Sequence, residues 1–227
     1  MTAFALAAGV GFAIIGAAAE RIASVWPPDE ASRRPPGWRT ALFGVVAGLA
    51  AWAIVNRSTL PAWATLVHLL VLALLVLMSA TDLEQRRLPH LLLDPLIAIC
   101  VVFAFVNPTV SLLNAAIGAA AAVALLGGLA LVIRSGVALG DLYLIAPLGL
   151  LLGWPAIFVA IFIGGLLVSA SSLVLLASRR VGMKSYVPFG PFLAAGTVIT
   201  LLRDDSLLGP PAAAAAVLIG QLLGRTY

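Results

Sequence analysis

The stretch PAWATLVHLLVLALLVLMSATD, residues 61–82, is apolar over almost its whole length and ends on a carboxylate. A helix of about 20 such residues crosses the roughly 30 Å hydrocarbon core of a bilayer. The whole chain shares this character, because it is 63% hydrophobic and 10% charged, with a mean hydropathy of +1.14. Long continuous apolar runs exclude a β-barrel, whose strands are short and alternate. The sequence therefore predicts an all-α, polytopic transmembrane helical bundle formed by a single integral-membrane domain, residues 1–227.

Apolar windows predict about eight or nine membrane spans. The windows cover residues 2–25, 41–56, 61–81, 88–106, 110–133, 141–153, 155–178, 187–202 and 207–223. The sixth window is short, so we expect it to lie inside the bundle or to cross where the bilayer thins. Residues 203–227 are expected to form either a ninth span or an interfacial helix. The apolar N-terminus lacks a basic region and a clear cleavage site, so a retained span is expected there rather than a removed signal.

The basic residues set the expected orientation of these spans. With the N-terminus outside and nine alternating spans, the outer segments carry only Arg57 and Arg203 of the thirteen basic residues. This distribution follows the positive-inside rule. Residues 27–40, rich in proline and charge, become an extended, solvated cytoplasmic loop whose basic side chains contact headgroups. Glu84, in the next cytoplasmic loop, is expected to help anchor that loop at the membrane surface.

The same topology brings two carboxylates to one face of the membrane. Asp82 ends the third predicted span, and Asp141 begins the sixth, directly after Gly140. An ionisable group facing lipid costs about 2.5–3.5 kcal/mol on insertion scales, so such residues usually face a protein interior or a water-filled cavity. We therefore expect the two carboxyl groups to meet. Taken alone, Asp141 would also fit a helix N-cap, and Asp82 a solvated helix end.

Three motifs resemble those of the type IV prepilin peptidases, the GxGD intramembrane aspartic peptidases of family A24. In TDLEQRRLPH, residues 81–90, an aspartate ends one span and a proline opens the next. ALGDLYL, residues 138–144, resembles the GxGD motif, with Ala138 in place of its first glycine. YVPFGPFLAAG, residues 186–196, resembles the family's C-terminal Pro-Phe-Gly-Pro signature. The supporting residues expected from these motifs are Gly140, Pro89, Pro188, Gly190 and Pro191.

The resemblance implies an aspartic endopeptidase of the bacterial inner membrane. Its implied substrates are type IV prepilins or type II secretion pseudopilins, from which it removes a basic leader at the cytoplasmic face. By the resemblance, Asp82 and Asp141 are the catalytic pair. In such a pair one carboxylate activates water while the other carboxyl, kept neutral, donates a proton. The implied partners are the substrate and the lipid bilayer, and no nucleic acid is expected although the net charge is +4.

Two departures from the family pattern lie near the aspartates. Tyr143 stands where a lysine is usual, and His90 stands where an acid or an amide is usual. Family members that also N-methylate the mature pilin use S-adenosylmethionine and carry two CxxC pairs, whereas this chain has one cysteine. We therefore expect no cofactor for the peptidase, and S-adenosylmethionine only if N-methylation is retained. Two histidines and one cysteine give no support to a metal site.

Two other functional classes fit parts of the sequence. A small polytopic transporter could use Asp82 and Asp141 as a proton or ion relay. Transporters usually place such groups near the bilayer midplane and contain internal repeats, and neither feature is predicted here. The second class comprises GxGD peptidases of the presenilin or signal-peptide-peptidase kind. Their Tyr-Asp and Pro-Ala-Leu motifs are missing from this sequence.

Overall fold

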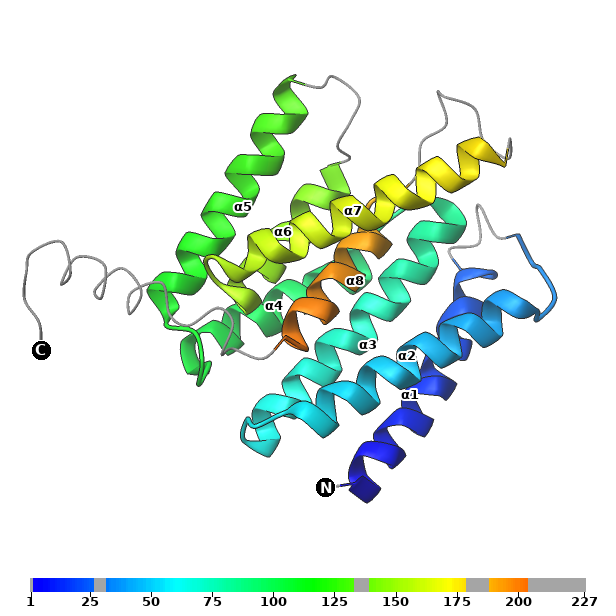
Figure 1. Ribbon diagram of the computed structural model, residues 1–227, viewed down its shortest axis with the longest axis horizontal. Helices are drawn as coiled ribbons and strands as arrows, with labels where there is room; N and C mark the ends of the chain where they lie inside the picture. Colours follow the sequence, from blue (N-terminus) through cyan, green and yellow to red (C-terminus); the bar gives the residue numbers. More distant parts are fainter. Residues whose placement is uncertain (1, 27–31, 133–138, 179–187, 204–227) are drawn as a thin grey trace, which may run out of the picture.

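The computed structural model describes residues 2–26, 32–132, 139–178 and 188–203, and the regular structure in these ranges is entirely helical. The helices are α1 (Thr2–Ala23), α2 (Trp38–Arg57), α3 (Ala62–Gln85), α4 (His90–Val106), α5 (Leu112–Val132), α6 (Leu139–Leu152), α7 (Ala156–Ala177) and α8 (Gly190–Leu201). They pack against one another as a bundle (Figure 1). This architecture confirms the predicted all-α polytopic fold class.

The number of helices able to span a membrane is lower than the eight or nine expected. By length and composition, five of the described helices qualify: α1, α2, α3, α5 and α7. Helices α4, α6 and α8 are apolar but have only 17, 14 and 12 residues. At about 1.5 Å per residue, α6 and α8 are about 21 and 18 Å long, shorter than a hydrocarbon core of roughly 30 Å. The hydropathy windows overcounted because a helix buried in protein is as apolar as one facing lipid. The predicted segment 207–223 lies outside the described residues.

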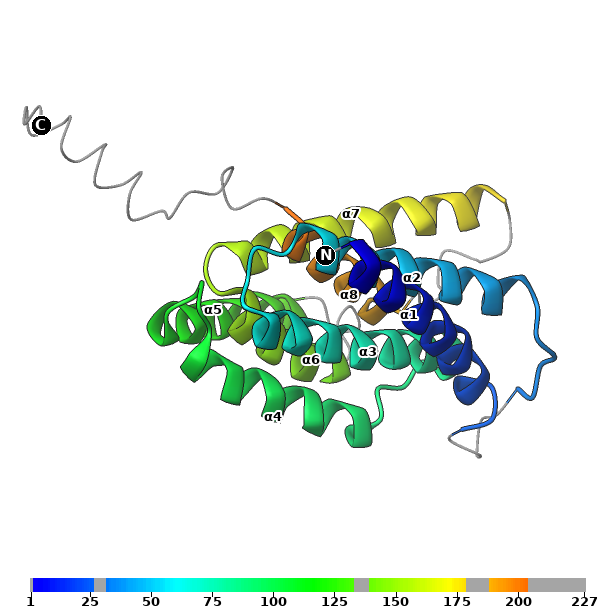
Figure 2. The same ribbon diagram turned by 90° about the horizontal axis from the view of Figure 1, so that it is seen from below.

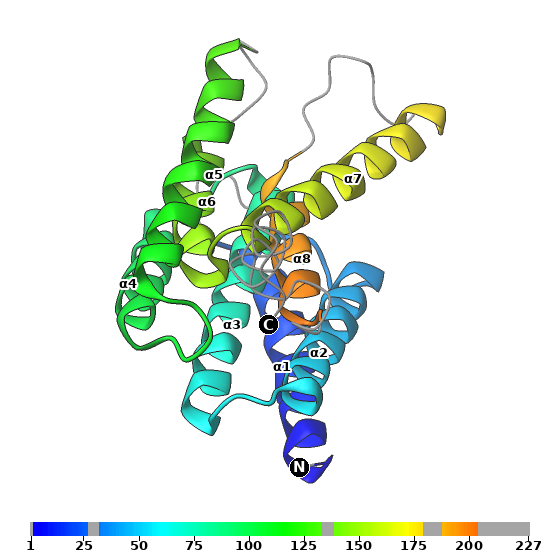
Figure 3. The ribbon, with the colours of Figure 1, turned by 60° about the vertical axis from the view of Figure 1, so that its left-hand side comes forward.

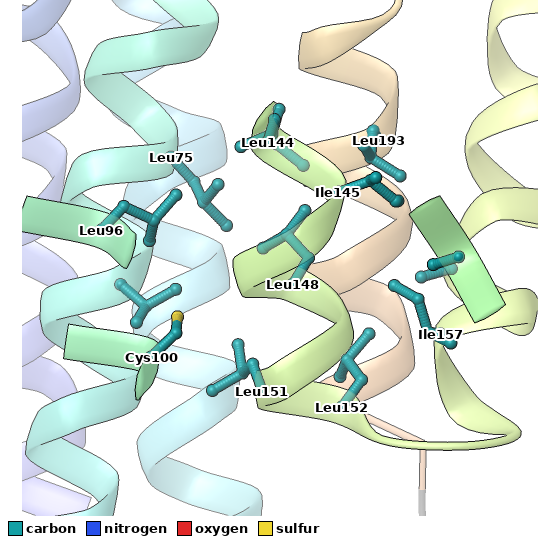
Figure 4. Close-up of a cluster of buried hydrophobic side chains, with 14 of the residues drawn as sticks. Leu75, Leu96, Cys100, Leu144, Ile145, Leu148, Leu151, Leu152, Ile157 and Leu193 are labelled. Atoms are coloured by element: carbon teal, nitrogen blue, oxygen red, sulfur yellow. The ribbon is translucent and has the colours of Figure 1, made fainter. Parts of the chain in front are cut away.

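Helix α6 lies in the interior of the bundle, as its short apolar window predicted. Its side chains Leu144, Ile145 and Leu148 are no more than 1% exposed. They belong to a core cluster that also contains Leu75 from α3 and Leu96 from α4 (Figure 4). A buried leucine or isoleucine contributes about 1.5–3 kcal/mol relative to an exposed one when the alternative is water. In lipid that driving force is largely absent, so close packing must hold α6 in place.

Helix α3 contacts α1, α2, α4 and α8. Figure 1 shows α8 between α3 and α7, and Figure 2 shows α4 on the side of α3 and α6 opposite α7. The α7–α8 packing requires Gly196, because a β-carbon there would lie 2.2 Å from the carbonyl oxygen of Ala160. The C-terminal ends of α5 and α7 diverge from each other (Figure 3). Between these diverging ends lie the first turns of α6 and α8.

The loop before α2 differs from its prediction. Helix α2 begins at Trp38, whereas the apolar window began at residue 41. The window stopped early because hydropathy counts Arg39 and Thr40 as breaks, although both side chains have partners in the bundle. Residues 27–31 of the predicted loop lie outside the described ranges. Residues 32–37 are exposed apart from the half-buried Arg34, as expected of a solvated connection, and Arg34 attaches this part of the loop to the bundle.

Candidate active site

Three helix ends meet at the two aspartates. Asp82 lies in the last turn of α3, Asp141 in the first turn of α6, and Gly190 is the first residue of α8. Both carboxyl side chains are buried, since Asp82 is 5% exposed and Asp141 is 3% exposed. The two residues are thus buried at the same place although they are 59 positions apart in the sequence.

The geometry around Gly190 gives an upper limit on the distance between the carboxyl groups. A β-carbon placed on Gly190 would lie 2.6 Å from Oδ2 of Asp82 and 3.8 Å from Oδ1 of Asp141. These two oxygens are therefore at most 6.4 Å apart, the sum of the two distances. A carboxyl pair this close interacts electrostatically, and its members do not titrate independently. The structure brings the two predicted residues together; their catalytic roles stay a prediction.

Two helix N-termini and one backbone N–H group lie beside the carboxyl pair. The helix N-termini of α6 and α8 both lie at the site, and a helix N-terminus carries a partial positive charge of about half a unit. The backbone N–H of Gly190 interacts with the Asp82 carboxyl group. Oδ2 of Asp82 is buried and has no hydrogen-bond partner among the described residues. This oxygen is therefore available to a water molecule or to a substrate group.

The predicted supporting residues shape the backbone around the pair. Pro188 is buried, and Pro191 occupies the first turn of α8, where a missing N–H has no cost. Pro89 precedes α4 as its N-cap residue. A β-carbon on Gly140 would lie 3.1 Å from a methyl carbon of Leu88, so the α6 start packs tightly against the α3–α4 loop. Of the three motifs, residues 138, 186 and 187 lie outside the described ranges.

The two residues that depart from the family pattern contact each other. The rings of His90 and Tyr143 meet edge to face with centroids 5.9 Å apart. Tyr143 is 54% exposed, and His90 also lies 3.9 Å from the exposed Asp94. This exposed cluster lies beside the site, on the first turns of α4 and α6, rather than inside it. Among the described residues, no group of three or more histidine, cysteine, aspartate or glutamate side chains is arranged to hold a metal ion.

A buried ion-pair network next to the site was missed by the sequence reasoning. Arg34 from the α1–α2 loop forms an ion pair with Glu84 of α3 and lies 3.5 Å from Glu20 of α1. Nη1 of Arg39 lies 3.5 Å from Oε2 of Glu84, and the Thr40 hydroxyl donates a 2.7 Å hydrogen bond to Glu20. Both glutamate side chains are only 6% exposed. Arg34 and Arg39 thus have protein partners in addition to the headgroup contacts expected of them, and those headgroup contacts stay a prediction.

The sequence contained a signal for this network. Glu20 and Glu84 both end apolar spans at the predicted cytoplasmic face, where buried acids need cationic partners. A further contact ties the same ends together, since Nε2 of Gln85 donates a 2.9 Å hydrogen bond to the Ala23 carbonyl. The last turn of α3, which carries Asp82, is thus attached to α1 and to the loop that follows it.

Known proteins with similar sequences share the part of the chain that contains the two aspartates. A model of the type IV leader peptidase family matches residues 69–173, which include Asp82 and Asp141. The chain is also 34% identical over 158 residues to the prepilin leader peptidase/N-methyltransferase of Aeromonas hydrophila, covering 67% of this chain and 54% of that protein. The chain belongs to the type IV leader peptidase family. The resemblance inferred from the three motifs is confirmed.

Other relatives of this type IV leader peptidase family member carry the same name. The prepilin leader peptidase/N-methyltransferase of Burkholderia pseudomallei (strain K96243) is 34% identical over 175 residues, covering 74% of this chain and 56% of that protein. The prepilin leader peptidase/N-methyltransferase of Neisseria gonorrhoeae is 32% identical over 171 residues, covering 73% of this chain and 57% of that protein. The chain therefore spans little more than half the length of the curated relatives it matches. No solved structure matches the chain.

Proposed function

We propose that this protein is a membrane-embedded aspartic endopeptidase that removes the basic leader from type IV prepilins or type II secretion pseudopilins. Family membership supports leader cleavage. The single observation that supports the aspartic mechanism is the meeting of two buried carboxyl groups, Asp82 and Asp141, at the first residue of α8. A peptide bond presented at the ends of α3, α6 and α8 would lie within reach of both.

In the proposed reaction, one carboxylate accepts a proton from a water molecule as the water oxygen attacks the scissile carbonyl carbon. The other carboxyl, which is protonated, donates its proton to the carbonyl oxygen. The tetrahedral intermediate then collapses: the C–N bond breaks, and the leaving amine takes up a proton from the pair. At the same time a hydroxyl of the intermediate returns its proton to the other carboxylate, which restores the pair. The positive ends of α6 and α8 would stabilise the single negative charge that the pair carries throughout.

We further propose that cleavage takes place at the cytoplasmic face of the bacterial inner membrane. The predicted topology supports this orientation, since all basic residues but Arg57 and Arg203 fall on the side where α3 ends and α6 and α8 begin. A leader that is itself basic would remain on the same side by the same rule. The scissile bond would then lie where the leader joins the membrane-inserted part of the substrate.

The test uses purified full-length protein in detergent or liposomes with a prepilin substrate. Asp82→Asn and Asp141→Asn should each abolish loss of the leader, because asparagine neither accepts nor donates the required proton. Asp94→Asn is the matched control, since Asp94 is exposed on α4 and its only described partner is His90. Mass spectrometry of the product reports cleavage, and thermal unfolding checks that the variants remain folded. Wild-type cleavage by either variant would refute the carboxyl pair.

The same assay also tests N-methylation. Prepilin is incubated with and without S-adenosylmethionine, and the mature product is weighed. An added methyl group would assign to this protein the second activity that appears in the names of its relatives. The expectation from the sequence is cleavage alone.

A further inference from the structure

An apolar groove of about 380 Å³ lies between α2, α3 and α8. Five side chains from each helix line it, spanning residues 42–50, 72–83 and 191–199. Among these lining residues only Ser79 carries a polar side-chain atom. In Figures 1 and 3 these three helices lie next to one another on one side of the bundle. The groove borders the core cluster around α6, with which it shares Leu75 and Ala194.

One end of the groove lies level with the candidate active site along α3 and α8. Leu83, which lines it, follows Asp82 directly, and Pro191, which also lines it, follows Gly190. From Leu83 to Leu72 the groove follows α3 for about 17 Å, or roughly three helical turns. An occupant of this groove would therefore run along the membrane-spanning part of α3 and end level with the two carboxyl groups.

The shape of the groove suits a helix more than a lipid chain. Its deepest side chains include Ala47 and Ala194, which are 1% and 6% exposed, and Ala195 lies beside them. Small residues of this kind allow a second helix backbone to approach closely within a membrane. The rim is formed by larger apolar side chains, among them Leu42 and Val46, which are 49% and 56% exposed. Rim side chains of this size would flank a helix lying on the small residues.

We infer that this groove binds the apolar helix of the substrate that directly follows the cleavage site. The inference rests on the proposed function and adds to it the surface that aligns the substrate. An apolar helix against α2, α3 and α8 places the residue at its cytoplasmic end next to Asp82 and Asp141. Recognition along the groove depends on shape and apolar contact, so it accepts helices of different sequence.

The experiment compares two substrates: a full-length prepilin, and a soluble peptide that carries the leader and cleavage site without the apolar helix. Ala195→Trp fills the groove, and Ala120→Trp is its matched control, because Ala120 is exposed on α5 and does not line the groove. Ala195→Trp should raise KM for prepilin by about tenfold or more, because a blocked central contact usually weakens binding at least that much. Cleavage of the short peptide should stay close to that of the wild type, and Ala120→Trp should change neither substrate.

Each result separates the groove from the catalytic proposal. If Ala195→Trp changes the cleavage of both substrates equally, the groove does not bind the substrate helix. If it changes the cleavage of neither substrate, the groove again does not bind that helix, and this is also the result expected if a lipid chain occupies the groove. The carboxyl-pair proposal would instead be refuted by prepilin cleavage in the Asp82→Asn or Asp141→Asn variant. If the Ala195→Trp variant does not fold, a crosslinking experiment tests the groove instead. The Ala195→Cys variant should crosslink to a cysteine placed in the first turns of the substrate helix, and the control variant Ala120→Cys should not. Native Cys100 is buried and does not interfere. Absence of that crosslink would overturn the inference.

Discussion

A methyl group at position 190 should impair catalysis without unfolding the protein. In Gly190→Ala the new β-carbon would lie 2.6 Å from Oδ2 of Asp82, whereas ordinary contact begins at 3.4 Å. The carboxyl group is the end of a side chain, so it can move, and it has to move by about 0.8 Å. A misplacement of about 1 Å in catalytic geometry costs on the order of 10²-fold in rate. We expect kcat to fall by about 10- to 100-fold, or roughly 1.4–2.7 kcal/mol in activation free energy.

Stability should respond differently from activity in this variant. Alanine is favoured over glycine in a helix by up to about 1 kcal/mol, so Gly190→Ala should unfold at a temperature no lower than that of the wild type. The assay measures kcat on a prepilin together with the thermal midpoint. Gly165→Ala is the control, because a β-carbon on that α7 glycine meets no neighbouring atom within 4 Å. A Gly190→Ala enzyme that cleaves at the wild-type rate would refute the position assigned to Asp82 relative to α8.

Three further predictions concern stability and pH dependence. Arg34→Ala removes the cationic partner of a buried acid, Glu84, and should lower the free energy of unfolding by about 1–3 kcal/mol. The loss should be smaller than for a fully buried ion pair, because Arg34 is 36% exposed. Chemical unfolding measures this change, and the control Arg203→Ala should show no such loss. Gly196→Val places side-chain atoms against the backbone of α7 and should cost about 1–3 kcal/mol or more, whereas Gly128→Ala, with open space around it, should be neutral in the same measurement. A plot of kcat/KM against pH should be bell-shaped, because cleavage needs one carboxyl ionised and its partner protonated, and a curve that only rises would contradict a pair.

Sequence reasoning was most successful where apolar length and charge decide the structure. It predicted an all-helical membrane protein and located α3 and α7 within a few residues, because long apolar runs leave few alternatives. It also predicted that Asp82 and Asp141 meet, and the structure brings both to the first residue of α8. The span count was too high, because hydropathy does not distinguish a helix buried in protein, such as α6, from one buried in lipid.

The details of the site depend on contacts between distant segments, and one sequence contains little information on these. Nothing in the motif around Gly190 indicates that its α-carbon faces the Asp82 carboxyl group. The pair formed by Arg34 and Glu84 joins residues 50 positions apart. Composition placed both at the cytoplasmic face but suggested lipid headgroups as partners. The packing of the α1–α2 loop against α3 supplies Arg34 as a protein partner for the buried Glu84.

The two shortest helices have a mechanical consequence for this protein. Helices α6 and α8 both begin at the carboxyl pair, and neither is long enough to reach across a bilayer of normal thickness. When a helix about 21 Å long tilts by ~3°, its end moves by about 1 Å. Thickening or thinning the lipid around the bundle changes helix tilt. If the proposed carboxyl pair carries the reaction, we expect the thickness of the surrounding membrane to change the separation of the two aspartates and with it the cleavage rate.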